Sequence, residues 1–223
     1  MGYRRHDNGA GWRLDASDRI ELEGEGTPRT EGRPITMATI AQDYGIAIHW
    51  AADRFDLRPA LIAAMIVKEA VREQPDWWRR DPTSYRKEPS GVESGGLMQT
   101  LVRTAQQMQD KLSIYHGVRG HDAELIDHED ITVQDLYVPE RSITLGAAYL
   151  RHLADYDGSG WDAPAGEDPV LLCCAYNAGG VYTSSKNRFH LRTYGAGRIE
   201  TFAAYWNDWM ALPDEIRCHG ERS

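Results

Sequence analysis

Apolar residues recur at steps of three and four through most of this 223-residue chain, and this spacing constrains the fold more than any other feature. It begins near Thr36 and continues past Leu57 as far as Ala70. It returns over residues 97–112, 142–156 and 198–210, and residues 169–178 form a short, strongly apolar segment. Apolar residues at this spacing lie along one face of an α-helix. We therefore predict a mostly α-helical fold.

The first 35 residues differ in character, because Gly, Asp, Glu, Arg and Thr dominate them and helical spacing is absent. Residues 12–15 and 19–22 alternate apolar and polar side chains, a pattern typical of short strands. A short hairpin and a flexible arm both fit this segment. We expect an N-terminal arm over residues 1–35, a helical domain over 36–215 and a tail over 216–223.

Composition excludes several functional classes. Lys and Arg number 25 against 34 Asp and Glu, a formal net charge of -9 that argues against general nucleic-acid binding. The mean hydropathy is -0.57, and no segment approaches the roughly 20 apolar residues of a membrane-spanning helix. Cys173 and Cys174 are adjacent and no Cys-x-x-Cys occurs, so the cysteines predict neither a zinc site nor a redox pair.

One glutamate stands out within the helical pattern. Ile62, Met65, Ile66 and Glu69 share a stripe of the helix predicted around them, which would direct a carboxyl group toward apolar surroundings. Such surroundings disfavour the charged form of a carboxyl group. A carboxyl group that keeps its proton near neutral pH can act as a general acid at a glycosidic oxygen. The alternative is structural: Glu69 ends its helix and reaches solvent, or pairs with a neighbouring Lys68 or Arg72.

Three further motifs follow Glu69 along the chain. They are Gly-Leu-Met-Gln within Ser90–Thr100, an Ile-x-x-Gly segment within Asp135–Leu150, and Tyr-Asn-Ala-Gly within Ala175–Gly180. In this order the four segments resemble the soluble lytic transglycosylase family of the lysozyme superfamily, to which goose-type lysozymes belong, and the resemblance covers residues from about 40 to 210. The resemblance implies a lysozyme-like helical domain with a substrate cleft.

Carried over residue by residue, the resemblance implies that Glu69 is the family's single catalytic acid and base. The positions that match substrate-binding residues are Ser90, Gly96, Met98, Gln99, Tyr176 and Asn177. Gly96 would line the sugar cleft because a side chain there would crowd the ligand. Tyr176 and Asn177 would face Glu69 across the cleft. The resemblance implies no cofactor and no metal.

Structural alternatives remain open for several of these residues. Met98 could simply be a core residue, and we predict that Tyr149 and Leu150 lie in the core. Asn177 and the residues after it could form only a helix C-cap, with a glycine at positive φ.

The chain also departs from the family pattern. Ala70 stands where a serine usually follows the catalytic glutamate, Ser142 replaces an asparagine and Thr100 replaces an aliphatic residue. The stretch between Glu69 and Ser90 looks expanded and contains Trp77 and Trp78. These indoles could stack on sugar rings at the cleft rim or fill a gap against the core.

The implied substrate is peptidoglycan, cut at the β-1,4 bond between N-acetylmuramic acid (MurNAc) and N-acetylglucosamine (GlcNAc) with formation of a 1,6-anhydro ring. Two alternatives stay open, a hydrolysing muramidase and a non-catalytic glycan-binding or assembly module. Hydrolysis would need a second carboxylate at a defined separation. The candidates for it are Glu73, Asp76, Glu88 and Glu93.

Two further expectations concern metals and location. A His-rich and acidic loop holds His116, His121 and His128, but its spacing matches no metal motif. The first residues are basic without an apolar stretch behind them, so we expect synthesis in the cytoplasm without a signal peptide. Action on the bacterial wall then favours a bacteriolytic phage endolysin, a virion-associated enzyme or a protein delivered by export machinery.

Overall fold

A computed structural model describes residues 2–5, 11–30, 34–70, 85–87, 93–115, 131–156, 165–179 and 188–217. Its helices are α1 (Pro34–Phe55), α2 (Pro59–Ala70), α3 (Val102–Tyr115), the 3-10 helix η1 (Asp135–Tyr137), α4 (Pro139–Asp155), α5 (Pro169–Ala178), α6 (Arg188–Met210) and α7 (Asp214–Arg217). Its strands are β1 (Trp12–Leu14), β2 (Ile20–Leu22), β3 (Tyr85–Lys87), β4 (Glu93–Gly95) and β5 (Thr100–Leu101). The predicted mostly α-helical fold class is confirmed.

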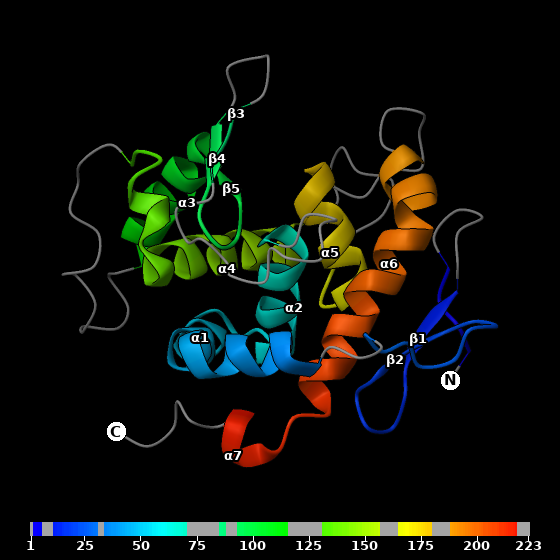
Figure 1. The fold of residues 1–223 in the computed structure, drawn as a ribbon. Helices are drawn as coiled ribbons and strands as arrows, with labels where there is room; N and C mark the ends of the chain where they lie inside the picture. The colour runs from blue at the N-terminus through cyan, green and yellow to red at the C-terminus, as the bar shows by residue number, and fades with distance from the viewer. Residues whose placement is uncertain are drawn as a thin grey trace.

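Helix α2 lies at the centre of the molecule, between α1, α4, α5 and α6 (Figure 1). Every residue from Ala60 to Val67 is buried, with at most 3% of its surface exposed. A helix that is apolar on all sides is stable only when protein surrounds it. Its charged residues, Lys68 and Glu69, come in the last turn. The buried central helix therefore ends in a pair of charged residues, Lys68 and Glu69.

The strands β3, β4 and β5 form a small antiparallel sheet that lies beside α3 (Figure 1). Gly95 pairs with Thr100, so residues 96–99 form the turn between β4 and β5. The apolar spacing predicts a helix from Leu97, but helix α3 begins at Val102. The prediction is wrong at this end because strand pairing and two residues at positive φ, Gly96 and Gln99, stop the helix.

The other helices agree with the sequence pattern more closely. Helix α4 begins at Pro139, where a proline costs no hydrogen bond in the first turn, and the apolar segment 169–178 is helix α5. Helix α6 begins at Arg188, ten residues before the predicted start at Arg198. Gly195 and Gly197 lower the helix propensity of this first part, which explains the late predicted start.

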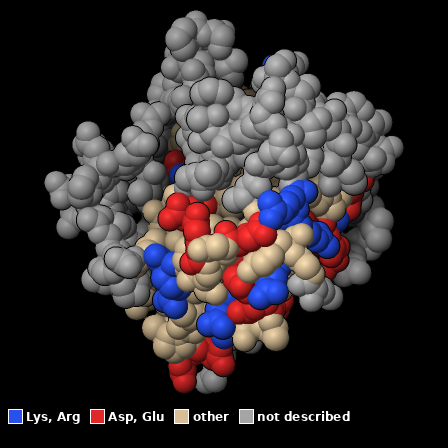
Figure 2. Space-filling model, turned by 90° about the vertical axis from the view of Figure 1, so that its right-hand side faces the viewer, with Lys and Arg blue, Asp and Glu red and all other residues tan. Residues whose placement is uncertain are grey.

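The N-terminal arm contains a short hairpin, one of the two alternatives that its sequence left open. Strand β1 pairs with β2 in antiparallel register, Trp12 with Leu22 and Leu14 with Ile20. The buried amide of Asn207 on α6 accepts a hydrogen bond from Ile20 N at 2.8 Å and donates to Ile20 O at 2.9 Å. Acidic and basic side chains are interspersed on this side of the molecule (Figure 2), in keeping with the ion pairs between Arg13 and Glu21 and between Arg29 and Asp208.

Candidate functional site

Glu69 lies in the last turn of α2, and its side chain is 16% exposed. The Glu69 Oε1 atom is 2.7 Å from the Nζ atom of Lys68, whose side chain is 4% exposed. One of the structural alternatives considered for Glu69, an ion pair with Lys68, is therefore present. This pairing is compatible with a catalytic role, because the carboxyl group remains partly accessible at the end of a rigid core helix.

The Gly-Leu-Met-Gln turn carries Gln99 on a strained backbone. Gln99 has a φ of 47°, a conformation uncommon outside glycine, asparagine and aspartate. Its side-chain Nε2 donates to Gly96 O at 2.8 Å, and its Oε1 accepts from Ser94 Oγ at 3.3 Å. Strain of this kind is found where the surrounding structure fixes a functional residue. The turn thus holds the Gln99 amide in one orientation.

Gly96 is required for a reason other than the one expected from the resemblance. Its φ is 74°, and a Cβ atom there would lie 1.9 Å from Leu136 O and 2.5 Å from Ser142 Oγ. A side chain at this position would collide with the protein itself. The close approach between the turn and η1 is enough to explain the glycine without a ligand.

Met98 has the placement of a core residue. Its side chain is fully buried and packs so closely on α4 that a Cβ atom on Gly146 would lie 2.7 Å from Met98 Cγ. The prediction that Met98 lines the cleft is therefore replaced by the core alternative.

Tyr176 joins helix α5 to the turn. Its hydroxyl donates to Met98 O at 3.0 Å and lies 2.9 Å from Thr100 Oγ1. Burial raises the pKa of Tyr176 above its ordinary value, the Thr100 hydrogen bond opposes this shift, and the negative charge of Glu69 adds to it. The hydroxyl of Tyr176 therefore ties α5 to the turn, and the charge of Glu69 on α2 is one of the influences on it.

The ring of Tyr149 on α4 also belongs to this cluster. Its centroid is 5.2 Å from that of Tyr176. The sequence predicts Tyr149 as a core residue, and its half-buried side chain packs against the core. Helical spacing alone could not indicate this neighbour, since the contact joins two helices.

Asn177 lies in the last turn of α5, and its side-chain Nδ2 donates to Cys173 O at 3.1 Å. Gly179 follows in a left-handed conformation with a φ of 73° and caps the helix. The capping role considered for this motif is thus present. Asn177 is half-buried and stands one residue after Tyr176.

Two departures from the family pattern have structural roles in this site. The hydroxyl of Ser142 accepts a hydrogen bond from Met98 N at 3.1 Å, and the hydroxyl of Thr100 bonds to Tyr176. Both side chains are buried and both hold the Gly-Leu-Met-Gln turn. From the sequence alone, Ser142 and Thr100 could be recognised only as departures from the family pattern.

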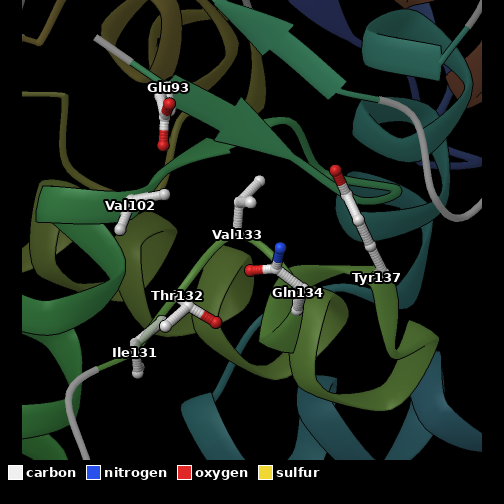
Figure 3. A pocket seen from close by; sticks show the side chains of 7 residues that line it. All are labelled: Glu93, Val102, Ile131, Thr132, Val133, Gln134 and Tyr137. Carbon is white, nitrogen blue, oxygen red and sulfur yellow. The ribbon is translucent and has the colours of Figure 1, made fainter. Parts of the chain in front are cut away.

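A pocket of about 580 Å³ lies between β4, the start of α3 and the segment before α4 (Figure 3). Its lining residues are Glu93, Val102, Ile131, Thr132, Val133, Gln134 and Tyr137. Glu93 was one of the candidate second carboxylates. Its side chain lies in this pocket, whose described lining does not include Glu69.

Several predicted residues lie outside the described part of the chain. These are Ser90, Trp77 and Trp78, the carboxylates Glu73, Asp76 and Glu88, and the histidines His116, His121 and His128. In the described part, no group of three or more His, Cys, Asp and Glu side chains is placed to hold a metal ion.

The transglycosylase SLT domain family matches residues 47–190, which include Glu69, the Gly-Leu-Met-Gln turn and Tyr176. The chain belongs to the SLT family. The predicted family membership is thereby confirmed, and the SLT match ends within α6. The hairpin of β1 and β2 precedes the SLT region.

A solved structure of an inactive mutant of lytic transglycosylase Slt from Pseudomonas aeruginosa is similar to this chain at 21% identity and a TM-score of 0.37. The similarity covers 78% of this chain and 21% of the Slt chain, so the SLT protein described here spans about a fifth of that relative. No curated protein matches. None of the described helices combines the length and apolar character needed to span a membrane.

Proposed function

We propose that this SLT protein is a lytic transglycosylase that cuts the β-1,4 bond between MurNAc and GlcNAc in peptidoglycan, with Glu69 as general acid and then general base. One observation carries the proposal: within the region matched by the SLT family, the partly accessible carboxyl group of Glu69 ends the central helix, and Tyr176 is bonded to the Gly-Leu-Met-Gln turn.

In the proposed reaction, the Glu69 carboxyl group donates its proton to the glycosidic oxygen, which leaves as the 4-hydroxyl of GlcNAc. The N-acetyl oxygen of the substrate stabilises the positive centre at C1 of MurNAc. The Glu69 carboxylate then takes the proton of the MurNAc C6 hydroxyl while O6 bonds to C1. Glu69 regains its proton, no water is consumed, and the product ends in a 1,6-anhydro ring.

In this scheme, some of the described residues contact the sugar, whereas others only position the turn. Glu69 is 16% exposed, so its carboxyl group is accessible to a bound sugar at the end of α2. The half-buried Gln99 and Asn177 supply amide groups of the kind that bind sugar hydroxyl and acetamido groups. The Tyr176 hydroxyl is already bonded within the protein, so we assign it to positioning the turn.

Replacement of Glu69 by Gln tests the proposal, with Glu200→Gln as the matched control because Glu200 is exposed on α6. We expect E69Q to slow the clearing of purified sacculi by 100-fold or more, on the order of the contribution of one general acid. E200Q should clear sacculi like the unmodified protein.

Unchanged clearing by E69Q would contradict the catalytic role of Glu69. Absence of clearing by the unmodified protein, together with retained binding to sacculi, would instead support the non-catalytic glycan-binding module. Phage or export-machine delivery remains a separate proposal, to be tested by locating the protein in virions or secreted fractions.

A further inference from the structure

Asp168 lies directly before helix α5, and only 5% of its side chain is exposed. Its Oδ1 atom caps the helix, because it accepts hydrogen bonds from Val170 N at 2.9 Å and from Leu171 N at 3.1 Å. A buried carboxylate is stable only when hydrogen bonds or charges satisfy both of its oxygens. The cap uses one oxygen, so the other needs a partner from elsewhere in the protein.

The N-terminal arm supplies these partners. Arg4 Nη1 donates to Asp168 Oδ2 at 2.8 Å, and the buried Trp12 indole donates to both oxygens, at 3.0 and 3.1 Å. Arg4 and Trp12 also pair with each other through their backbones, at 2.7 Å from Arg4 N to Trp12 O and 3.0 Å from Trp12 N to Arg4 O. The arm therefore docks on the start of α5 through two donors that its own backbone pairing holds together.

This contact crosses the boundary of the family match. The SLT family matches residues 47–190, so Asp168 lies inside the matched region, whereas Arg4 and Trp12 precede it. A segment that precedes the matched region thus completes the hydrogen bonds of a buried carboxylate within it.

Helix α5 connects this contact to the candidate site. Seven of its ten residues are buried, and Tyr176 lies eight residues after Asp168, about 12 Å along the helix axis. The Tyr176 hydroxyl donates to Met98 O at 3.0 Å and lies 2.9 Å from Thr100 Oγ1, so it is fixed to the Gly-Leu-Met-Gln turn. A short, tightly packed helix transmits a displacement from one end to the other. A shift at Asp168 should therefore move Tyr176 against the turn.

We propose that the N-terminal arm is a part of the active unit and that Asp168 is the positioning residue through which it acts. Held by Arg4 and Trp12, Asp168 fixes the start of α5 and so sets the place of Tyr176 against the turn. This inference rests on the proposed function, because the activity concerned is that of Glu69 and the turn. Displacement of a site by about 1 Å can slow an enzyme by about 100-fold, so a modest shift of α5 is enough to change the rate.

The test variant is Trp12→Phe, which keeps an aromatic ring and removes the indole N–H. Trp206→Phe is the matched control, because the buried Trp206 indole on α6 donates to Asp18 O of the arm at 2.7 Å. Each variant removes one indole donor between the arm and a helix, but only W12F reaches α5. Should W12F fail to fold, Asp168→Asn replaces it, since the amide oxygen can still cap α5 whereas the amide nitrogen cannot accept from Arg4.

Three quantities are measured: the urea midpoint of unfolding, the rate of product release from purified sacculi while each variant is folded, and the NMR signal of Tyr176. The signal is recorded with tyrosine carrying carbon-13 at Cζ and is assigned with Tyr176→Phe. We expect both tryptophan variants to lower the urea midpoint. W12F should also slow product release by about tenfold or more and shift the Tyr176 signal, whereas W206F should leave the rate and the signal near those of the unmodified protein.

A Tyr176 signal that stays in place in W12F would overturn the proposal, whatever happens to the rate, because a merely structural contact would leave Tyr176 where it is. A shifted signal with an unchanged rate would overturn it as well, since activity would then not depend on the arm. If the unmodified protein releases no product, the proposed function fails, but the Tyr176 signal still decides whether the arm positions α5.

Discussion

At the scale of single residues, the conformation of the turn before β5 is fixed by the atoms packed and hydrogen-bonded against it. Leu136 O and Ser142 Oγ occupy the space beside Gly96, and Met98 N bonds to Ser142. Tyr176 fastens the other end of the turn through Met98 O and Thr100. Gln99 is consequently positioned by backbone contacts rather than by its own side-chain preferences.

Replacement of Gly96 by Ala measures this constraint, and Gly24→Ala is a matched control. Both glycines have positive φ, but a Cβ atom on Gly24 meets no atom within 4 Å. We expect G24A to lower the free energy of unfolding by about 1–2 kcal/mol from backbone strain alone. G96A should cost about 3–5 kcal/mol because it also collides with backbone. Urea denaturation of both variants checks this prediction. An equal decrease in the free energy of unfolding in both would show that the turn can shift to accommodate a Cβ atom at position 96.

At the scale of elements, the 3-10 helix η1 supports both the turn and the pocket. Asp135 accepts hydrogen bonds at 2.8 Å from Thr132 N and Thr132 Oγ1, and it pairs with Arg141 on α4. Burial opposes ionisation of Asp135, but these hydrogen bonds and the arginine outweigh it and lower the pKa of Asp135 below its usual value. The ionised carboxylate therefore stabilises η1.

The sign of the pH dependence follows from this direction. A carboxyl group whose pKa is lower in the folded than in the unfolded protein stabilises the fold above the unfolded value of about 4, and the contribution disappears as the pH falls through the folded value. Asp135→Asn should lower the free energy of unfolding by about 0.5–1.5 kcal/mol at pH 7. The difference from the unmodified protein should narrow below about pH 4.

Thermal unfolding from pH 7 to pH 3 checks this prediction, with Asp43→Asn on the exposed surface of α1 as the control for the change in net charge. A gap between D135N and the unmodified protein that stays constant across this range would contradict it.

The elements also show what the sequence could predict. Helices α1, α2, α4 and α5 were predictable because their apolar spacing is local and their ends carry ordinary signals such as Pro139 and Gly179. The turn at residues 96–99 was not, because Leu97 and Met98 continue the apolar spacing of α3. The turn is closed by the pairing of Ser94 with Leu101 and of Gly95 with Thr100, which apolar spacing does not indicate.

Within the site, the order of the motifs was enough to propose roles for Glu69 and the Tyr-Asn motif, and these roles stay predictions. The burial of Met98 and the Lys68 ion pair could not, since both depend on how separate helices pack. Thr100 and Ser142 appeared only as departures from the family, and their hydrogen bonds across elements explain them.

At the scale of the whole molecule, the N-terminal arm is joined to the helices by buried polar contacts. Asn207 bonds to Ile20 and to Pro28 O, and the Trp12 indole donates to Asp168, which also caps α5 through Val170 N. Buried polar groups of this kind are costly to separate. The hairpin should therefore unfold together with the helices, although the boundary at residue 35 was predicted as a division.

Native-state hydrogen exchange tests this coupling. The amide of Ile20, which donates to Asn207 Oδ1, should exchange within about tenfold of the α2 amides around Ala64, because both would open only on global unfolding. Exchange at Ile20 that is faster by several orders of magnitude would show that the arm opens as an independent unit.

The central claim concerns the chemistry of Glu69, and the mass of the products tests it most directly. Purified sacculi are digested with the unmodified protein and with E69Q, and the soluble fragments are analysed by mass spectrometry. The account predicts fragments that end in 1,6-anhydro-MurNAc, each lighter by one water than the corresponding hydrolysis product, and at least a 100-fold loss of these fragments with E69Q. Fragments that all carry a reducing end, or an undiminished yield with E69Q, would contradict it.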